Sequence, residues 1–323
     1  MTLQNRTETA GTQEIFPQIE ARIDAIPGYK EASQQIADTI HSAVLDGGPA
    51  ARNAADLLHG TWLGHPLHPV LTDIPIGSWT LAALFDGLEA VTGNHYAGRV
   101  ADTLIGVGAA AAVPTALAGI ADYSAIKQDS TSLAAAHGAL NSVGLGLYLL
   151  SLNERRRGRR GRGRLFGALA FGLVTLSAGM GGDLVYRKRV GVNHAPEPAG
   201  PTEWIDALSL NELQIGAARR VDVEGEAVLL YRPDANLVRA ISAICNHAGG
   251  PLEEGNFKNG CVECPWHQSV FDLSDGHAVH GPATMPQPTY ATRVRNGQIQ
   301  VQLGRGAEYF ESLGNVRTRT IGE

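Results

Sequence analysis

The chain is poor in cysteine and has no excess of basic residues. Its 323 residues include only three cysteines, and 32 Asp and Glu outnumber 26 Lys and Arg, which gives a net charge of −6. Three cysteines exclude a disulfide framework. The negative charge argues against a nucleic-acid partner, because phosphate binding needs a basic surface. The N-terminal residues also lack the apolar core of a signal peptide.

Two of the cysteines stand in a spacing typical of a metal site. Each is paired with a histidine, in the runs Cys245-Asn-His247 and Cys264-Pro-Trp-His267. One such pair leaves half of a coordination sphere open, so we expect both pairs to close one common site. Two thiolates and two imidazoles fit a [2Fe-2S] cluster, with the thiolates on one iron and the imidazoles on the other. The same set also fits a structural zinc ion.

The residues around these pairs extend the pattern. Ala-Gly-Gly-Pro-Leu follows His247, the second run continues to Ser269, Phe271 and Asp272, and Gly281-Pro-Ala comes after it. With this pattern, residues 205 to 303 resemble the Rieske [2Fe-2S] ferredoxin family. The resemblance implies a cluster held by Cys245, His247, Cys264 and His267.

Four positions distinguish the chain from other members of that family. In Rieske proteins of quinol-oxidising respiratory complexes, the positions of Gly250 and Trp266 hold disulfide-forming cysteines, and that of Phe271 holds a tyrosine that donates to a ligand sulfur. The resemblance therefore implies a potential at the lower end of the Rieske range of about −150 to +300 mV. Gln268 replaces a glycine, which leaves the backbone geometry of the second loop open, because glycine can adopt angles that glutamine disfavours.

Four long apolar segments precede this region, at 68–91, 101–122, 133–152 and 165–186. Each approaches the roughly 20 residues needed to cross a bilayer, and their Gly, Ala and Ser content suits close packing of membrane helices. Asp73 and Asp86 interrupt the first segment, so a soluble four-helix bundle stays an alternative. Residues 55–192 also resemble a bacterial family of four-helix membrane proteins of unknown function. The resemblance is carried by the run from Leu63 to Gly77, Ala121-Asp-Tyr, the run His137 to Asn141, and Gly181-Gly-Asp-Leu-Val-Tyr.

Four alternating spans would bring many polar residues to one side of the membrane. The candidates for a haem b or quinone site are His65, His68 and His137, and the other polar residues at this side are Asp73, Asp122, Asn141, Asp183 and Tyr186. Ionisable residues within spans are costly and often functional. Two interpretations stay open. The residues either anchor helix ends in the headgroup region, or they form a pocket in which His68 and His137 ligate haem iron or donate to a quinone carbonyl.

Two signals for membrane orientation conflict. The loop 155–164 carries seven arginines and predicts a cytoplasmic position. An even number of spans would then place both termini outside the cell, although iron–sulfur clusters are assembled in the cytoplasm. The side of the cluster domain is therefore left open.

The sequence predicts a multidomain α + β protein, with a four-helix transmembrane bundle followed by an all-β Rieske [2Fe-2S] domain. The predicted parts are a helical segment at 1–60, broken at Gly47-Gly-Pro, a membrane domain at 61–190, a linker at 191–203, the Rieske domain at 204–304 and a tail at 305–323. Strands are expected at 219–223, 226–232, 237–243, 269–273, 289–295 and 298–303, with Cys261 on a further strand.

These features predict a protein of the cell membrane that transfers one electron at a time, with membrane lipid around it and a redox protein or quinone as partner. The alternatives are a ferredoxin serving an oxygenase and a non-catalytic redox sensor or scaffold. A self-contained Rieske oxygenase would need a further iron held by two histidines and a carboxylate. The 20 residues after 303 contain no histidine, so we do not expect that enzyme.

Overall fold

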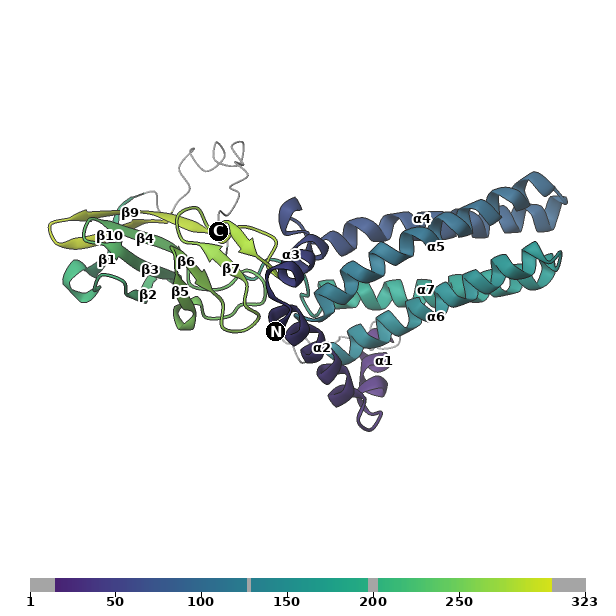
Figure 1. Cartoon of the computed structure of the whole chain (residues 1–323), viewed down its shortest axis with the longest axis horizontal. Coiled ribbons are helices and arrows are strands. Elements are labelled where there is room, and N and C mark those ends of the chain that lie inside the picture. The colour runs from purple at the N-terminus through teal and green to yellow at the C-terminus, as the bar shows by residue number, and fades with distance from the viewer. Residues whose placement is uncertain (1–14, 127–128, 197–202, 304–323) are drawn as a thin grey trace, which may run out of the picture. The chain divides into compact units, whose positions relative to one another are not determined.

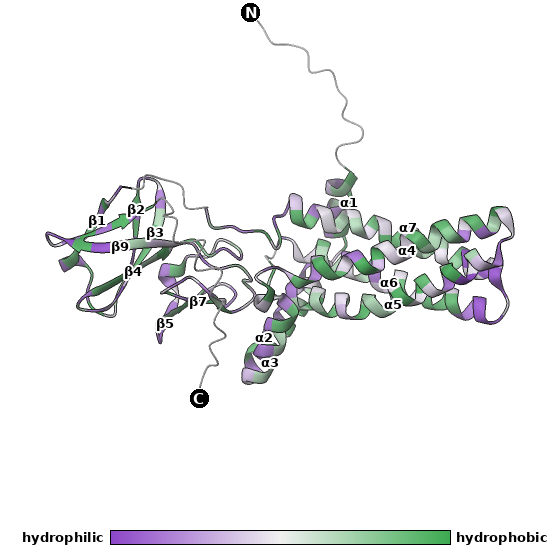
Figure 2. Ribbon diagram, turned by 90° about the horizontal axis from the view of Figure 1, so that it is seen from above, coloured by the Kyte–Doolittle hydropathy of each residue, from purple (hydrophilic) through white to green (hydrophobic). Residues whose placement is uncertain are grey.

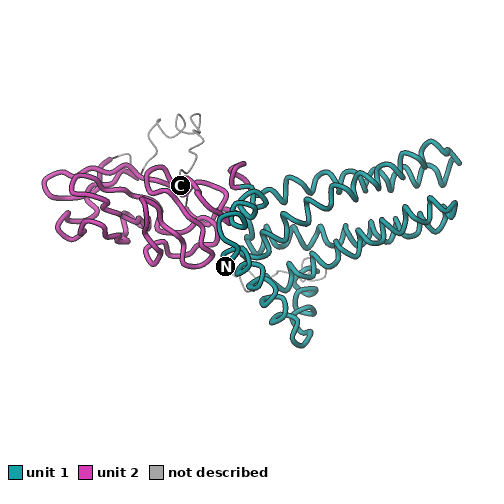
Figure 3. The backbone as a smooth tube through the Cα atoms, in the orientation of Figure 1, with its two compact units in different colours: residues 1–60, 66–191 teal, residues 61–65, 192–323 magenta. Residues whose placement is uncertain are grey.

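The structure is a computed structural model that describes residues 15–126, 129–196 and 203–303. These residues form two compact units, one of residues 15–60 and 66–191 and the other of residues 61–65 and 192–303 (Figure 3). We call them the helical unit and the β unit. The predicted tail at 305–323 and residues 197–202 of the predicted linker lie outside the described residues.

The helical unit contains three N-terminal helices and four longer ones. They are α1 (Ile15–Asp24), α2 (Tyr29–Asp46), α3 (Gly48–His59), α4 (Leu67–Thr92), α5 (His95–Tyr123), α6 (Thr131–Arg156) and α7 (Arg160–Tyr186). The long helices form two hairpins, α4 with α5 and α6 with α7 (Figure 1). Gly93 ends α4 at a φ of 70°, and the Asn94 side chain caps α5 by accepting a hydrogen bond from the N–H of Tyr96.

The N-terminal helices agree only partly with the predicted pattern. The break between α2 and α3 falls at Gly47, as predicted. Helix α1 was not predicted, and its apolar side chains are only partly buried, through contacts with distant helices. Phe16 and Ile23 pack against Leu133 and Met180. Gly179 makes room for the Phe16 ring, since a Cβ there would lie 2.2 Å from Cζ.

Three of the four long helices, α5, α6 and α7, are long and apolar enough to cross a membrane. Helix α4 has 26 residues but carries Asp73, Asp86 and Glu89. The long helices bury mainly small residues, whereas large apolar side chains such as Leu84, Val91 and Leu165 face outward. Figure 2 shows how frequent hydrophobic residues are along these helices, with hydrophilic residues at the end where α6 turns into α7. An apolar exterior around a small-residue interior is typical of membrane helices.

The β unit consists of two antiparallel sheets. The larger sheet has the order β1-β10-β9-β4-β3-β2 and the smaller has the order β5-β6-β7-β8. The strands are β1 (Ile205–Ser209), β2 (Ala218–Val223), β3 (Glu226–Asp234), β4 (Leu237–Ser242), β5 (Asn256–Lys258), β6 (Cys261–Glu263), β7 (Val270–Asp272), β8 (Ala278–His280), β9 (Thr289–Arg295) and β10 (Gln298–Gln302). Leu229 and Ile241 from the larger sheet form one core with Val262 and Phe271 from the smaller.

The six strands predicted by alternation are all present, and each of their ends lies within two residues of the prediction. The pair Asn296-Gly297 forms the β9–β10 hairpin turn, with φ angles of 53° and 75°. Strands β5 and β8 were not predicted, because three residues are too few for a period of two to be recognised. Strand β1, also not predicted, pairs with β10 far along the chain.

Candidate iron–sulfur site

Two loops with the same backbone pattern carry the predicted cluster ligands. The first follows β4 and begins at Cys245, and the second joins β6 to β7 and begins at Cys264. In each loop the cysteine N–H donates to the carbonyl five residues later, at Gly250 and Ser269, over 2.8 Å. The N–H of the fourth residue after each cysteine, Gly249 or Gln268, donates back to the cysteine carbonyl.

This pattern requires a left-handed residue at the fourth position. Gly249 adopts a φ of 84° and Gln268 a φ of 56°. The second loop therefore keeps the turn that glycine favours, although its residue is glutamine. A side chain at such a φ costs about 1–2 kcal/mol.

The two cysteine side chains are buried and face each other. Cys245 is 1% exposed and Cys264 2% exposed. A hydrogen bond between the two sulfurs raises the pKa of Cys245 and lowers that of Cys264 to about 7. Burial raises the pKa of both thiols. Backbone N–H groups of His247 and Ala248 oppose this for Cys245, and those of Trp266 and His267 oppose it for Cys264. The backbone N–H groups around both sulfurs favour the thiolate form, and the net effect is a lowered pKa at Cys264 alone.

The two histidines lie side by side and nearer to solvent than the thiols. The ring centroids of His247 and His267 are 5.0 Å apart, with planes at 85°, and both side chains are half-buried. Nδ1 of His267 is inaccessible to solvent, so this nitrogen faces the interior of the site. Gly250 lets the loops approach, because a Cβ there would lie 2.9 Å from Sγ of Cys264.

This donor set fits a two-iron cluster. The two sulfurs are buried and the two imidazoles are half-buried. This division suits a cluster in which two thiolates bind one iron and two imidazoles bind the other. Among the described residues, no three His, Cys, Asp or Glu side chains converge on a single metal position. A Rieske cluster does not need three, because each iron takes only two protein ligands.

Two buried amides that sequence reasoning missed hold the first loop in place. Gln287 is 0% exposed and donates from Nε2 to the carbonyls of Ser242 and Ile244, while its Oε1 accepts from the N–H of Asn246 at 3.0 Å. The Asn246 side chain donates to the carbonyls of Met285 and Pro286. Asn246 lies inside the ligand motif, which was a usable signal, whereas nothing in the sequence pattern marked Gln287.

A third loop covers the site from the β8–β9 connection. The buried hydroxyl of Ser269 accepts a hydrogen bond from the N–H of Ala283 at 3.0 Å. The Gly281–Pro282 peptide bond in this loop is cis. The predicted run Gly281-Pro-Ala therefore contacts the second ligand loop directly.

In the helical unit, the structure brings together two of the three histidines predicted for a second cofactor, with the polar residue Asn141 beside them. The rings of His68 on α4 and His137 on α6 have centroids 6.4 Å apart. Nδ2 of Asn141 lies 3.1 Å from Nε2 of His137. His65 belongs to the segment 61–65 of the β unit, so the structure does not place it in this pair.

The remaining predicted polar residues have other surroundings. Asp122 forms an ion pair with His59 of α3 at 2.9 Å, and Asp183 binds Arg187, which also contacts Glu20 of α1. These carboxylates attach the N-terminal helices to the long ones. Asp73 and Tyr186 are exposed.

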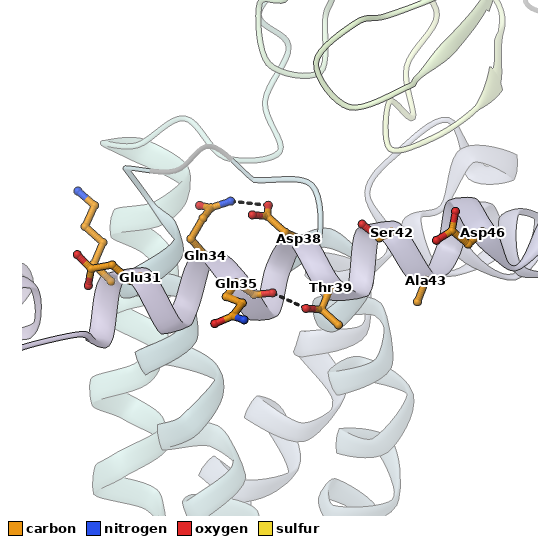
Figure 4. Close-up of a pocket in the computed structure, with 9 residues that line it drawn as sticks. Glu31, Gln34, Gln35, Asp38, Thr39, Ser42, Ala43 and Asp46 are labelled. Atoms are coloured by element: carbon orange, nitrogen blue, oxygen red, sulfur yellow. Dashed lines mark hydrogen bonds between the residues drawn. The ribbon is translucent and has the colours of Figure 1, made fainter.

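A shallow groove along α2 contains none of the predicted site residues. Polar side chains line it, with Gln34 donating to Asp38 and the Thr39 hydroxyl to the carbonyl of Gln35 (Figure 4). These bonds join residues one helical turn apart on a solvated face, which is ordinary for an exposed helix.

Comparisons with known proteins identify both parts of the chain. Residues 203–291 match the Rieske [2Fe-2S] domain family, and residues 64–194 match the family described as "Predicted membrane protein (DUF2231)". The ferredoxin component of the naphthalene 1,2-dioxygenase system from Pseudomonas aeruginosa is 31% identical over 101 residues, which are 31% of this chain and 96% of the ferredoxin.

Other relatives share the Rieske region alone. Cholesterol 7-desaturase nvd 1 from Ciona intestinalis is 34% identical over 34% of this chain and 23% of its own length. The solved ferredoxin of carbazole 1,9a-dioxygenase from Nocardioides aromaticivorans IC177 is 31% identical and covers 31% of this chain and 98% of that one, with a TM-score of 0.30. By its family match and its identity to nearly the full length of the Pseudomonas ferredoxin, the chain belongs to the Rieske [2Fe-2S] family, with an electron-carrier domain that follows a predicted membrane-protein domain of the DUF2231 family.

Proposed function

We propose that the protein is a membrane-anchored one-electron carrier in which Cys245, Cys264, His247 and His267 hold the [2Fe-2S] cluster. The observation that carries the proposal is the convergence of the two ligand loops. Each loop supplies one buried thiol, backbone N–H groups directed at its sulfur, and one half-buried imidazole.

The arrangement gives these residues separate roles. The two thiolates would hold one iron from the buried side of the site, and the two half-buried imidazoles would hold the other iron nearer to solvent. When bound, the cluster supplies the capacity to accept and release one electron. Trp266 is 48% exposed beside His267 and offers an apolar contact for a redox partner. Gly250 and Phe271, which replace a cysteine and a hydrogen-bonding tyrosine, favour a low potential.

Four spans, rather than three, form the proposed anchor. Helix α4 exposes seven large apolar side chains, namely Val70, Ile74, Ile76, Leu81, Leu84, Leu88 and Val91. Its Asp86 and Glu89 are paired with Arg155 and Arg160. Paired carboxylates cost less in a membrane than isolated ones, so the charges do not prevent α4 from crossing. Electron exchange with a quinone or haem in this unit is part of the proposal.

A ferredoxin that serves an oxygenase is the second candidate. It is favoured by the relatives, several of which are named as ferredoxin components of dioxygenase systems. Both candidates use the same cluster and differ in the partner.

The test is electron paramagnetic resonance of membranes containing the full chain. After reduction with dithionite, we expect the low-average-g signal of a Rieske cluster. His247→Ala and Cys264→Ser should abolish this signal, while Cys261→Ser, which removes the thiol outside the site, should keep it. A wild-type sample without the signal, with the protein present, would contradict the proposal. Adding a quinone or a purified oxygenase and following reoxidation separates the two candidates.

A further inference from the structure

The four long helices repeat one hairpin twice. Residues of α4 and α6 correspond with an offset of 69, which aligns four identical pairs: His68 with His137, Leu71 with Leu140, Gly77 with Gly146 and Leu81 with Leu150. Residues of α5 and α7 correspond with an offset of 62, which aligns Ala116 with Ala178 and Gly119 with Gly181.

Equivalent residues of the two hairpins meet each other at three levels. His68 faces His137, Trp79 stacks on Tyr148 with centroids 4.4 Å apart, and Asp86 is paired with Arg155. In each pair the second residue is the counterpart of the first at the offset of 69. Equivalent positions can meet at several levels only if the two hairpins are related by a local twofold axis that runs along the helices. The two histidines lie near one end of this axis, because they are close to the N-terminal ends of α4 and α6.

Each hairpin holds its histidine through the same type of bond to a backbone carbonyl, and the Ser177 hydroxyl, which donates to the carbonyl of His137, also lies 2.9 Å from Nδ1 of that ring. Nδ1 of His68 donates to the carbonyl of Thr115 on α5 at 2.9 Å, and Nδ1 of His137 donates to the carbonyl of Ser177 on α7 at 2.8 Å. A glycine one turn further on admits each ring. A Cβ on Gly119 would lie 2.9 Å from Cε1 of His68, and one on Gly181 would lie 3.1 Å from Cε1 of His137.

These bonds decide the chemistry that the pair can perform. A carbonyl oxygen only accepts, so Nδ1 of both rings carries the hydrogen and Nε2 of a neutral ring carries a lone pair. The contact between Nδ2 of Asn141 and Nε2 of His137 agrees, because an amide N–H needs an acceptor. A quinone carbonyl needs a donor, which this tautomer does not present at Nε2. A metal ion needs the lone pair, and metal-ligating histidines typically donate their other N–H to a carbonyl.

We propose that His68 and His137 form a two-histidine transition-metal site, in which Nε2 of each ring binds haem iron or a bare metal ion on the local twofold axis. A metal about 2.0–2.1 Å from two opposed imidazole nitrogens requires ring centroids roughly 6 Å apart, and the observed separation is 6.4 Å. The metal replaces the Asn141 amide at Nε2 of His137. The site deepens the proposed electron-transfer function by adding a second metal centre.

The test uses His68→Asn and His137→Asn in the full chain, purified in detergent from cells supplied with iron, copper and zinc. The asparagine amide nitrogen occupies the place of Nδ1 and keeps the bond to the carbonyl, but no atom replaces Nε2. We expect the wild type to contain one metal per chain beyond the two irons of the cluster, and both variants to lose it. A Soret absorption band identifies haem, and extra metal without that band identifies a bare ion.

Two control variants distinguish histidines that bind a metal from histidines that only hold the helices together. His95→Ala, an exposed histidine of the same unit, and Asn141→Ala should both keep the extra metal. The Rieske signal is read in every sample, so failure of this site is distinguishable from failure of the cluster assignment. A wild type with no extra metal and no Soret band overturns the proposal, as does extra metal that persists in the asparagine variants.

Discussion

Gln268 is the side chain at which the local backbone and the residue type disagree. It occupies the position equivalent to Gly249, at a φ of 56°, and its N–H closes the second ligand loop by donating to the carbonyl of Cys264. The loop therefore keeps its turn although glutamine disfavours the left-handed conformation, because hydrogen bonds within the loop hold Gln268 in place.

Replacing Gln268 with glycine should stabilise the protein. Relief of the left-handed conformation is worth about 1–2 kcal/mol, and the added freedom of glycine in the unfolded chain costs about 0.5–1 kcal/mol, so we expect a gain of about 0.5–1 kcal/mol. The measurement is the denaturant midpoint for loss of the visible cluster absorption. Gln268→Ala keeps the strained angle and should show no gain. Equal midpoints for the glycine and alanine variants would disprove the strain.

Gln287→Leu should be strongly destabilising. The amide satisfies three buried backbone groups, at Ser242, Ile244 and Asn246, and each buried group left without a partner costs about 1–3 kcal/mol. We expect a loss of about 3 kcal/mol or more in the free energy of unfolding, together with faster loss of the cluster. The matched control is Gln214→Leu, which replaces an exposed amide of the same unit and should change the stability little. A Gln287 variant as stable as this control would contradict the bracing role.

Cys261 should react slowly with alkylating reagents. Burial raises the pKa of its thiol, and the nearby carboxylates of Asp272 and Asp275 raise it further. Only the thiolate reacts. Because the pKa of Cys261 is raised, its alkylation rate should still increase with pH at values where the alkylation rate of a free cysteine is already constant. Mass spectrometry of iodoacetamide-treated protein over a pH series measures this rate. A rate that levels off at the same pH as free cysteine would contradict the assignment.

The charged residues near the C-terminal end of α4 take part in the packing of the long helices against one another. Arg155 of α6 is 1% exposed at its side chain and binds Asp86 of α4 and Asp102 of α5. Gly163 of α7 makes room for it, since a Cβ there would lie 2.5 Å from Cγ of Arg155. The seven arginines of the 155–164 loop are therefore not a uniform basic surface, because several of them hold the long helices together.

Removing this buried cation should loosen the helical unit. Arg155→Leu leaves Asp86 buried without its partner, and breaking a buried ion pair costs about 3–5 kcal/mol. We expect a clear fall in the thermal midpoint of the protein in detergent. Asp86→Asn in the Arg155→Leu background should recover part of the loss, because it removes the uncompensated charge. Arg157→Leu, at an exposed position, should behave as the wild type.

The number of spans decides on which sides of the membrane the ends of the chain lie. With α4 to α7 all crossing, the N-terminal helices and the β unit share one side, and with only α5 to α7 crossing they lie on opposite sides. Because α4 exposes many large apolar side chains and pairs its C-terminal charges, we expect the same side.

Labelling of intact spheroplasts tests this topology. A membrane-impermeant maleimide at raised pH reports the side of Cys261, and protease treatment reports the side of an epitope tag on the N-terminus. Cys261→Ser is the control for labelling specificity. Opposite sides would rule out the four-span arrangement.

Local sequence was enough for the features that depend on residue type and short spacing. The cysteine and histidine spacings predicted a metal site, and the resemblance of the residues around them to the Rieske family implied the cluster. Both signals are local, because the ligands sit in two short loops. The long helices and six strands followed from apolar runs and alternation, since burial of a helix or a strand face imposes its own period.

Only tertiary structure decided the features in which distant residues meet. Gln287 reaches the first ligand loop from about 40 positions away, α1 and the short strands are stabilised by packing, and the charges of α4 are matched by an arginine on α6. The contact between His68 and His137 also depends on tertiary structure, because it joins two separate helices. The carbonyl that sets the tautomer of each ring lies on a further helix. No local pattern encodes these contacts, since each depends on how separate segments pack in space.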